Sequence, residues 1–231
     1  MKKLTTLLFM LLFTAGMAIA QNNNVAEQVQ NSTGSTGSEA FIEQVGSWND
    51  AYQEQGRASD AYAKQVGNRN ESDQSSTKGQ ADLDVLQVGN DNRALQEGTN
   101  QTVGMDITQR GNRNFGRQES SARTSSATLL QIGDDNISRQ FNFSPDNTRG
   151  NVMSVEQRGN DNIAYQSQDG PDSGSASTSS SGTIYSNGNL NFASQVQEGG
   201  MNTAAISQFG NSNSAVQTQL GGGNTATIIQ R

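Results

Sequence analysis

The sequence predicts an all-β fold: a β-solenoid in which strand-turn-strand repeats of about 22 residues stack into a cross-β, amyloid-like column. Three observations predict it. A short motif recurs ten times at regular spacing, and fixed periods are typical of stacked units. Alternate residues within the motif keep their chemical type, which is the side-chain period of a β-strand. Each copy also contains glycine and asparagine, which tolerate the positive φ of a tight turn.

The motif is clearest in VEQRGNDNIAYQ, at residues 155–166. If its first glutamine is position 0, glycine follows at position 2, asparagine at position 5, a small residue at position 7 and usually glutamine at position 9. Ser186 replaces the position 0 glutamine once. The predicted turn glycines are Gly46, Gly67, Gly89, Gly111, Gly133, Gly159, Gly188, Gly199, Gly210 and Gly221.

The spacing of the copies predicts that like residues stack. Position 0 advances by 22 residues at each step from Gln65 to Gln131, and by 11 from Ser186 to Gln219. Rungs about 4.8 Å apart would place each amide over an amide. A buried polar row is then satisfied, instead of costing about 1–3 kcal/mol per unpaired group. The predicted stacking ladder is Gln44, Asn49, Gln65, Asn70, Gln87, Asn92, Gln109, Asn114, Gln118, Gln131, Asn136, Gln140, Gln157, Asn162, Gln166, Gln197, Asn202, Gln208, Asn213, Gln219, Asn224 and Gln230.

The residues before position 0 follow the same alternation, but they are apolar. Leu83 and Val85 precede Gln87, and Met105 and Ile107 precede the next copy. One strand therefore supplies aliphatic groups and its partner supplies asparagine, a small residue and glutamine. The small residue leaves room for the aliphatic group that faces it, as in two packed inner faces.

The first twenty residues predict a secretory signal peptide. Lys2 and Lys3 precede a short apolar run, and Ala18 and Ala20 have the spacing of a cleavage site. We therefore expect a mature chain from about Gln21, outside the cytoplasm and without a membrane span. Removal of residues 1–20 takes away two of the 15 basic residues and none of the 22 acidic ones, so the net charge changes from −7 to −9. An acidic chain argues against nucleic acid as a partner.

The remaining chain divides into four segments. Residues 21–37 are an Asn/Gln-rich leader, residues 38–166 and 186–231 hold the repeats, and residues 167–185 are a Gly/Ser-rich loop or linker. A second irregular segment, residues 141–150, contains a proline and stretches one spacing to 26. We interpret the repeats as one domain with an inserted loop, and a linker between two domains is the alternative.

The composition excludes several kinds of site. The chain has no histidine and no cysteine, so it has no disulfide framework and lacks the usual general base and thiol nucleophile. We expect no catalytic residues, no enzyme activity and no cofactor. Acidic turns such as Gly89–Asp91 suggest calcium, but one carboxylate per rung is too few, so we predict no metal site. The scattered outward charges are interpreted as solvation, with protection against premature aggregation as the alternative.

At these residues the sequence resembles the curlin repeat of curli-type functional amyloid, with the consensus Ser-x5-Gln-x-Gly-x-Gly-Asn-x-Ala-x3-Gln. The segment from Gln219 to Gln230 matches each position after the leading serine. The resemblance covers about residues 44–230, and the segment after the signal is similar to the secretion-targeting leader of that family. In most copies the second glycine and the leading serine are absent, and the closing glutamine falls at position 9 instead of 11.

The resemblance implies a secreted β-solenoid subunit of extracellular fibres at the surface of a Gram-negative bacterium. Such a subunit would self-assemble, leave through a dedicated outer-membrane secretion pore and start on a nucleator or major-subunit homologue. The fibres would contribute to biofilm matrix, adhesion and surface aggregation. The alternative from the residues is a monomeric secreted β-solenoid that binds a ligand, of adhesin or ice-binding type.

Overall fold

The computed structural model describes residues 23–31, 37–56, 58–77, 80–99, 103–122, 124–143, 150–170 and 179–231. These residues form eighteen β-strands and no helix. The odd-numbered strands form one sheet, the odd sheet: β1 (Val25–Gln30), β3 (Asp50–Gln55), β5 (Glu71–Ser76), β7 (Arg93–Gly98), β9 (Phe115–Ser120), β11 (Ile137–Phe143), β13 (Ile163–Asp169), β15 (Phe192–Glu198) and β17 (Ser214–Leu220). The even-numbered strands form the even sheet: β2 (Ala40–Ser47), β4 (Asp60–Asn68), β6 (Ala81–Asn90), β8 (Val103–Arg110), β10 (Ser125–Ile132), β12 (Val152–Arg158), β14 (Ser181–Asn187), β16 (Thr203–Phe209) and β18 (Thr225–Gln230).

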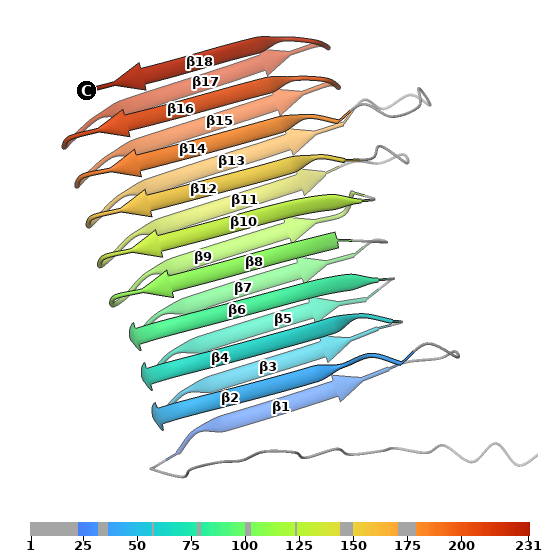
Figure 1. Cartoon of the computed structure of the whole chain (residues 1–231). Helices are drawn as coiled ribbons and strands as arrows, with labels where there is room; N and C mark the ends of the chain where they lie inside the picture. The colour runs from blue at the N-terminus through green and yellow to red at the C-terminus, as the bar shows by residue number, and fades with distance from the viewer. Residues whose placement is uncertain are drawn as a thin grey trace, which may run out of the picture.

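Within each sheet the strands follow in chain order and pair in parallel, so each coil contributes one strand to each sheet (Figure 1). The register places like on like. Between β6 and β8, Val85 pairs with Ile107, Gln87 pairs with Gln109 and Leu83 pairs with Met105. The predicted all-β fold and the β-solenoid of coils about 22 residues long are confirmed.

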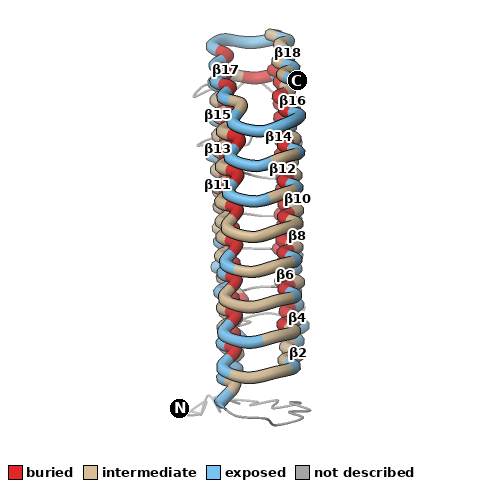
Figure 2. Tube along the Cα trace, turned by 90° about the vertical axis from the view of Figure 1, so that its left-hand side faces the viewer, coloured by how far each residue is buried: buried red, intermediate tan, exposed pale blue. Residues whose placement is uncertain are grey.

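The core lies between the two sheets. Figure 2 shows that buried residues follow one another along both sheets for most of the length of the column. The even sheet contributes aliphatic side chains such as Ile107 and Leu129, which are buried. The odd sheet opposite contributes small residues. A Cβ atom on Gly116 would lie 2.6 Å from Leu129 Cδ2, so the small residue at position 7 is required by the aliphatic group across the core.

The turn glycines are fixed by the distance between coils. Gly111 has a φ of 122°, and a Cβ atom there would lie 2.1 Å from the carbonyl oxygen of Gly133 in the next coil. Both the backbone conformation and the close approach therefore require glycine. Two residues further on, Arg113 has a φ of 55°, and Asp135 occupies the same place in the next coil with a φ of 58°. The residue at this corner therefore has the left-handed backbone conformation, and its amino-acid type differs from coil to coil.

The ten motif copies do not all occupy the same edge of the column. Eight turn glycines lie where an even strand leads into an odd strand, which we call the even-to-odd edge. Gly199 and Gly221 lie at the opposite, odd-to-even edge, because they follow β15 and β17. Copies spaced by 11 residues therefore alternate between the sheets, and stacking neighbours remain about one full coil apart.

Two predicted connecting segments overlap strands. Residues 25–30 of the leader form β1, which pairs with β3 from Val25 to Gln30. In the segment 167–185, residues 167–169 belong to β13 and residues 181–185 to β14. Both sheets continue across this segment, because β12 pairs with β14 and β13 pairs with β15. The predicted signal peptide, residues 1–20, lies outside the described residues, among which there is no helix long and apolar enough to span a membrane.

The turn geometry predicts that valine destabilises the fold far more at a turn glycine than at a glycine on the outer face of a strand. Gly111→Val introduces a β-branched residue at positive φ and against the Gly133 carbonyl, so we expect a loss of at least about 2 kcal/mol in the free energy of unfolding. The control is Gly104→Val on the outer face of β8, where an added Cβ atom has no heavy atom within 4 Å. Chemical denaturation measures both, and equal midpoints for the two variants would contradict this account of the turn.

Candidate functional site: rows of stacked amides

The candidate site is a set of side-chain rows that run along the column, at right angles to the strands. The first is the inner asparagine row at the even-to-odd edge, whose side chains point into the core. It consists of Asn24, Asn49, Asn70, Asn92, Asn114, Asn136, Asn162, Asn191 and Asn213.

Each member of the inner asparagine row between its two ends links three coils. The backbone N–H and the side-chain Nδ2 of Asn114 both donate to Asn92 Oδ1 in the preceding coil, at 3.1 Å each. Its Nδ2 also donates to the carbonyl oxygen of Gly133 in the following coil, at 2.7 Å. Asn136 repeats these contacts one coil further on. The asparagine therefore closes the turn and ties it to its two neighbours.

Two glutamine rows lie side by side in the core. The even glutamine row consists of Gln44, Gln65, Gln87, Gln109, Gln131, Gln157, Gln208 and Gln230, with Ser186 between Gln157 and Gln208. The odd glutamine row consists of Gln28, Gln53, Gln74, Gln96, Gln118, Gln140, Gln166, Gln195 and Gln217.

The amides in these rows bond along the column and across the core. Gln109 Nε2 donates to Gln131 Oε1 at 2.9 Å, and to the backbone oxygen of Arg93 in the odd sheet at 3.0 Å. In the odd glutamine row, Gln118 Nε2 donates to Gln140 Oε1 at 2.8 Å and to the backbone oxygen of Asp106 in the even sheet at 3.0 Å. Gln109 and Gln118 therefore each join successive coils and both sheets.

The remaining predicted ladder residues lie at the odd-to-even edge. Gln197 and Gln219 belong to the odd sheet, where Gln197 Nε2 donates to Gln219 Oε1 at 2.9 Å. Asn202 donates from Nδ2 to the carbonyl oxygen of Gly221 at 2.8 Å, and accepts from the backbone N–H of Asn224 at 3.0 Å. Gln197 and Gln219 therefore lie in the odd sheet, whereas Gln208 lies in the even sheet, and Asn202 and Asn224 lie at the turns that lead into β16 and β18.

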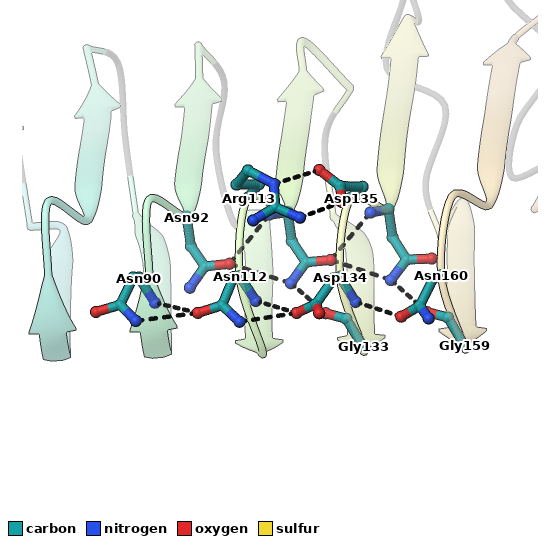
Figure 3. A network of polar contacts seen from close by, with 11 residues as sticks. Asn90, Asn92, Asn112, Arg113, Gly133, Asp134, Asp135, Gly159 and Asn160 are labelled. Carbon is teal, nitrogen blue, oxygen red and sulfur yellow. Dashed lines mark hydrogen bonds and ion pairs between the residues drawn. The ribbon is translucent and has the colours of Figure 1, made fainter.

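A further row was missed in the sequence. The outer asparagine row consists of Asn68, Asn90, Asn112, Asp134, Asn160, Asn189 and Asn211. It lies beside the inner asparagine row at the surface of the even-to-odd edge (Figure 3). The backbone N–H of Asn90 donates to Asn112 Oδ1 at 3.1 Å, and that of Asn112 to Asp134 Oδ1 at 2.7 Å. The signal in the sequence is an Asn or Asp three residues after position 0, within turns of the kind that suggest calcium.

Charged corner residues pair between successive coils beside the outer asparagine row. Arg113 Nε donates to Asp135 Oδ1 at 2.7 Å, and Arg69 Nε donates to Asp91 Oδ1 at 2.5 Å. These hydrogen bonds lower the pKa of both carboxyl groups. Surface pairs of this kind contribute little each, and from Arg69 to Asp135 the corner charge alternates in sign between successive coils.

An acidic patch lies on the outer face of the even sheet. We define it as Asp82 and Asp84 in β6 and Asp106 in β8, and Asp84 pairs in register with Asp106. Burial, followed by the charges of Asp82 and Asp106, raises the pKa of Asp84 to about 6. Burial also raises the pKa of Asp106. Unlike the corner residues, these stacked carboxylates repel one another.

The chemistry that these rows offer is serial hydrogen bonding. Among the described residues, no group of three or more Asp or Glu side chains is arranged to hold a metal ion. The described polar side chains instead meet in lines parallel to the column, with a donor and an acceptor at each step.

The inner asparagine row predicts a large effect of a small truncation. Asn114→Ala leaves the Gly133 carbonyl without its Nδ2 donor and Asn136 without its acceptor, while Asn92 Oδ1 keeps only the backbone N–H of residue 114, at a cost of roughly 1–3 kcal/mol for each buried group left unpaired. Asn187→Ala, at an exposed position, should change the free energy of unfolding by less than about 0.5 kcal/mol. Guanidinium denaturation of both variants measures the difference, and similar losses would argue against the buried row.

The acidic patch predicts that stability falls as the pH rises. Because the pKa of Asp84 is raised from 3.8 to about 6, the folded chain holds this proton more tightly than the unfolded chain. Its favourable contribution is present below the unfolded pKa and is lost as the pH rises through the folded value. The denaturation midpoint should therefore decrease between about pH 4 and pH 7, and Asp84→Asn should flatten this decrease. A steeper decrease in the variant would contradict the assignment.

Comparison with known families agrees with the geometry. The family model described as the curlin associated repeat matches residues 202–231, which contain β16, β17 and β18. A search of curated proteins found no match. The matched segment carries both kinds of turn and continues the same amide rows as the rest of the column. The match therefore supports the assignment of this chain to the curlin family.

Proposed function

We propose that the chain is a secreted structural subunit of extracellular, curli-like amyloid fibres, and that it assembles by in-register stacking of its amide rows. The curlin family consists of structural amyloid subunits of bacterial surface fibres, not of enzymes. The observation that carries the proposal is that the inner asparagine row and the odd glutamine row each add one amide per coil in the same register. A further coil supplied by another chain could therefore continue the rows.

The ends of the column supply the driving force for such addition. In the described residues, β1 and β17 end the odd sheet and β2 and β18 end the even sheet, so each of these four strands has one neighbouring strand. A sheet edge presents a row of N–H and C=O groups that can pair with another chain. Stacked identical segments then satisfy both backbone and side chains, as in amyloid.

The wider role follows from the family and belongs to the proposal. Export through an outer-membrane pore, initiation on a nucleator or major-subunit homologue, and contributions to biofilm and adhesion would all be shared with curli-type subunits. The outer residue just after position 0 differs among coils, as in Val66, Val88, Arg110 and Ile132. A flat ligand-binding face would favour one repeated residue, so this variation supports assembly over a monomeric binding function.

Fibre diffraction tests the proposed assembly. The chain without its predicted signal peptide, incubated at increasing concentration, should form fibres with reflections near about 4.8 Å along the axis and about 10 Å across it. Formation should depend steeply on concentration. A folded monomer that persists at high concentration would instead favour the alternative of a monomeric binding solenoid, of adhesin or ice-binding type.

A further inference from the structure

One buried amide nitrogen at the C-terminal end of the column has no hydrogen-bond acceptor among the described residues. Gln217 in β17 is 6% exposed, and its Nε2 lacks an acceptor. Gln195, one coil earlier in the same row, donates from Nε2 to Gln217 Oε1 at 3.1 Å. An unpaired buried amide group costs about 1–3 kcal/mol. The donor of Gln217 faces the position that the next coil of the odd sheet would occupy.

The glutamine rows have a direction. In each glutamine–glutamine bond of the described residues, the Nε2 of the earlier coil donates to the Oε1 of the later coil, from Gln28 to Gln53 at 3.0 Å at the start of the odd glutamine row through to its last pair at the other end. The C-terminal end therefore presents donors. At the N-terminal end, no described residue donates to Gln28 Oε1. The two ends are complementary.

The inward residues of the end strands also match. In the odd sheet, β1 presents Ala26, Gln28 and Gln30 to the core, and β17 presents Ala215, Gln217 and Gln219. In the even sheet, β2 presents Ala40, Ile42 and Gln44, and β18 presents Ala226, Ile228 and Gln230. Each set has the same three residue types in the same order. A joint between two chains would therefore repeat the like-on-like pairing found within one chain.

Burial at the ends agrees with a missing neighbour. Ile206 in β16 is fully buried, whereas Ile228, which pairs with it in β18, is only partly buried. At the N-terminal end, Ile42 and Gln44 are partly exposed in the same way. Another coil on either end would cover these inward side chains.

The backbone at the N-terminal end is also oriented for pairing. The N–H groups of Val25 and Asn31 donate to the carbonyl oxygens of Asn49 and Gln55 in the next coil. Since backbone groups alternate in direction along a strand, those of Ala26, Gln28 and Gln30 point to the open edge of the odd sheet.

Charge favours this joint over a joint between two N-terminal ends. The strands β17 and β18 contain no charged residue, whereas β1 and β2 carry Glu27 and Glu43. Placing β1 and β2 on β17 and β18 therefore puts acidic side chains beside neutral ones. Two N-terminal ends would bring Glu27 close to its own copy, which costs energy, whereas Glu43 is paired with Lys64 within its own chain.

We propose that β1 and β2 of one chain dock on β17 and β18 of another copy, with Gln217 Nε2 donating to Gln28 Oε1 of the second chain. The leader segment from Val25 to Gln30 is then the odd-sheet half of the joint. This inference rests on the proposed self-assembly, which it specifies in orientation, register and partner strands.

Disulfide trapping tests the register, since the native chain has no cysteine. The joint places Val216 beside Glu27 of the next chain in the odd sheet, and Thr227 beside Phe41 in the even sheet. Neighbouring strands are about 4.8 Å apart, within the range for a disulfide. We would make the double variants Glu27→Cys/Val216→Cys and Phe41→Cys/Thr227→Cys. The crossed controls are Glu27→Cys/Thr227→Cys and Phe41→Cys/Val216→Cys, whose cysteines lie in different sheets at the joint.

Each sample is assembled, checked by fibre diffraction, oxidised, denatured without reductant and separated by size. The two matched variants should give a ladder of covalent oligomers that includes most chains, and the crossed controls should remain monomeric. If one of the two matched variants fails to assemble, covalent oligomers from the other matched variant still support the joint. Cross-β fibres without matched-pair oligomers, or with equal oligomers from the crossed controls, would overturn this joint and leave the proposed function intact. A native chain that forms no fibres would overturn both.

Discussion

The column depends on one constraint: each buried amide needs a hydrogen-bond partner at the equivalent strand position of the next coil. This requirement fixes the register even where the coil length changes. Gln131 and Gln157 are 26 residues apart, yet Gln131 Nε2 reaches Gln157 Oε1 at 2.9 Å, the same distance as between Gln109 and Gln131. The extra residues therefore lie in the connection after β11, because a shift of one residue within a strand would turn each inward side chain to the outer face.

The aliphatic and the amide side chains of the core contribute differently to the structure. Aliphatic side chains such as Val85 and Ile107 remove apolar surface from water, which stabilises the column without fixing direction. The amides add direction, since each bond has a donor end and an acceptor end. The inner asparagine row runs opposite to the glutamine rows: Asn114 donates to the preceding coil, whereas Gln118 donates to the following coil. The two ends of the column are therefore chemically different.

Most of the fold and of the amide rows could be predicted from the sequence, because the motif indicates both where the turns lie and which strand residues point inward. The glycine and asparagine at fixed offsets identify a turn between two strands, and residues such as Gln87 fall at the inward positions of a strand. The sequence could not show that Gln197 and Gln208 lie in different sheets, because a spacing of 11 is half a coil and the same motif serves both edges. It also concealed β1, since Val25–Gln30 has the alternation of a strand but no glycine turn ahead of it.

The distribution of charge is consistent with a column that both stays soluble and grows. Arg113 and Asp135 neutralise each other at the even-to-odd edge, while the carboxylates of the acidic patch lie on β6 and β8, away from either end. Repulsion between stacked carboxylates weakens the middle of the column, where the buried rows are continuous and can offset it. At the C-terminal end the rows stop and charge is absent from the last strand of each sheet, so nothing electrostatic opposes the strand that would satisfy Gln217. Under the proposed assembly, the charged coils and the coils that accept the next chain are therefore different coils of one column.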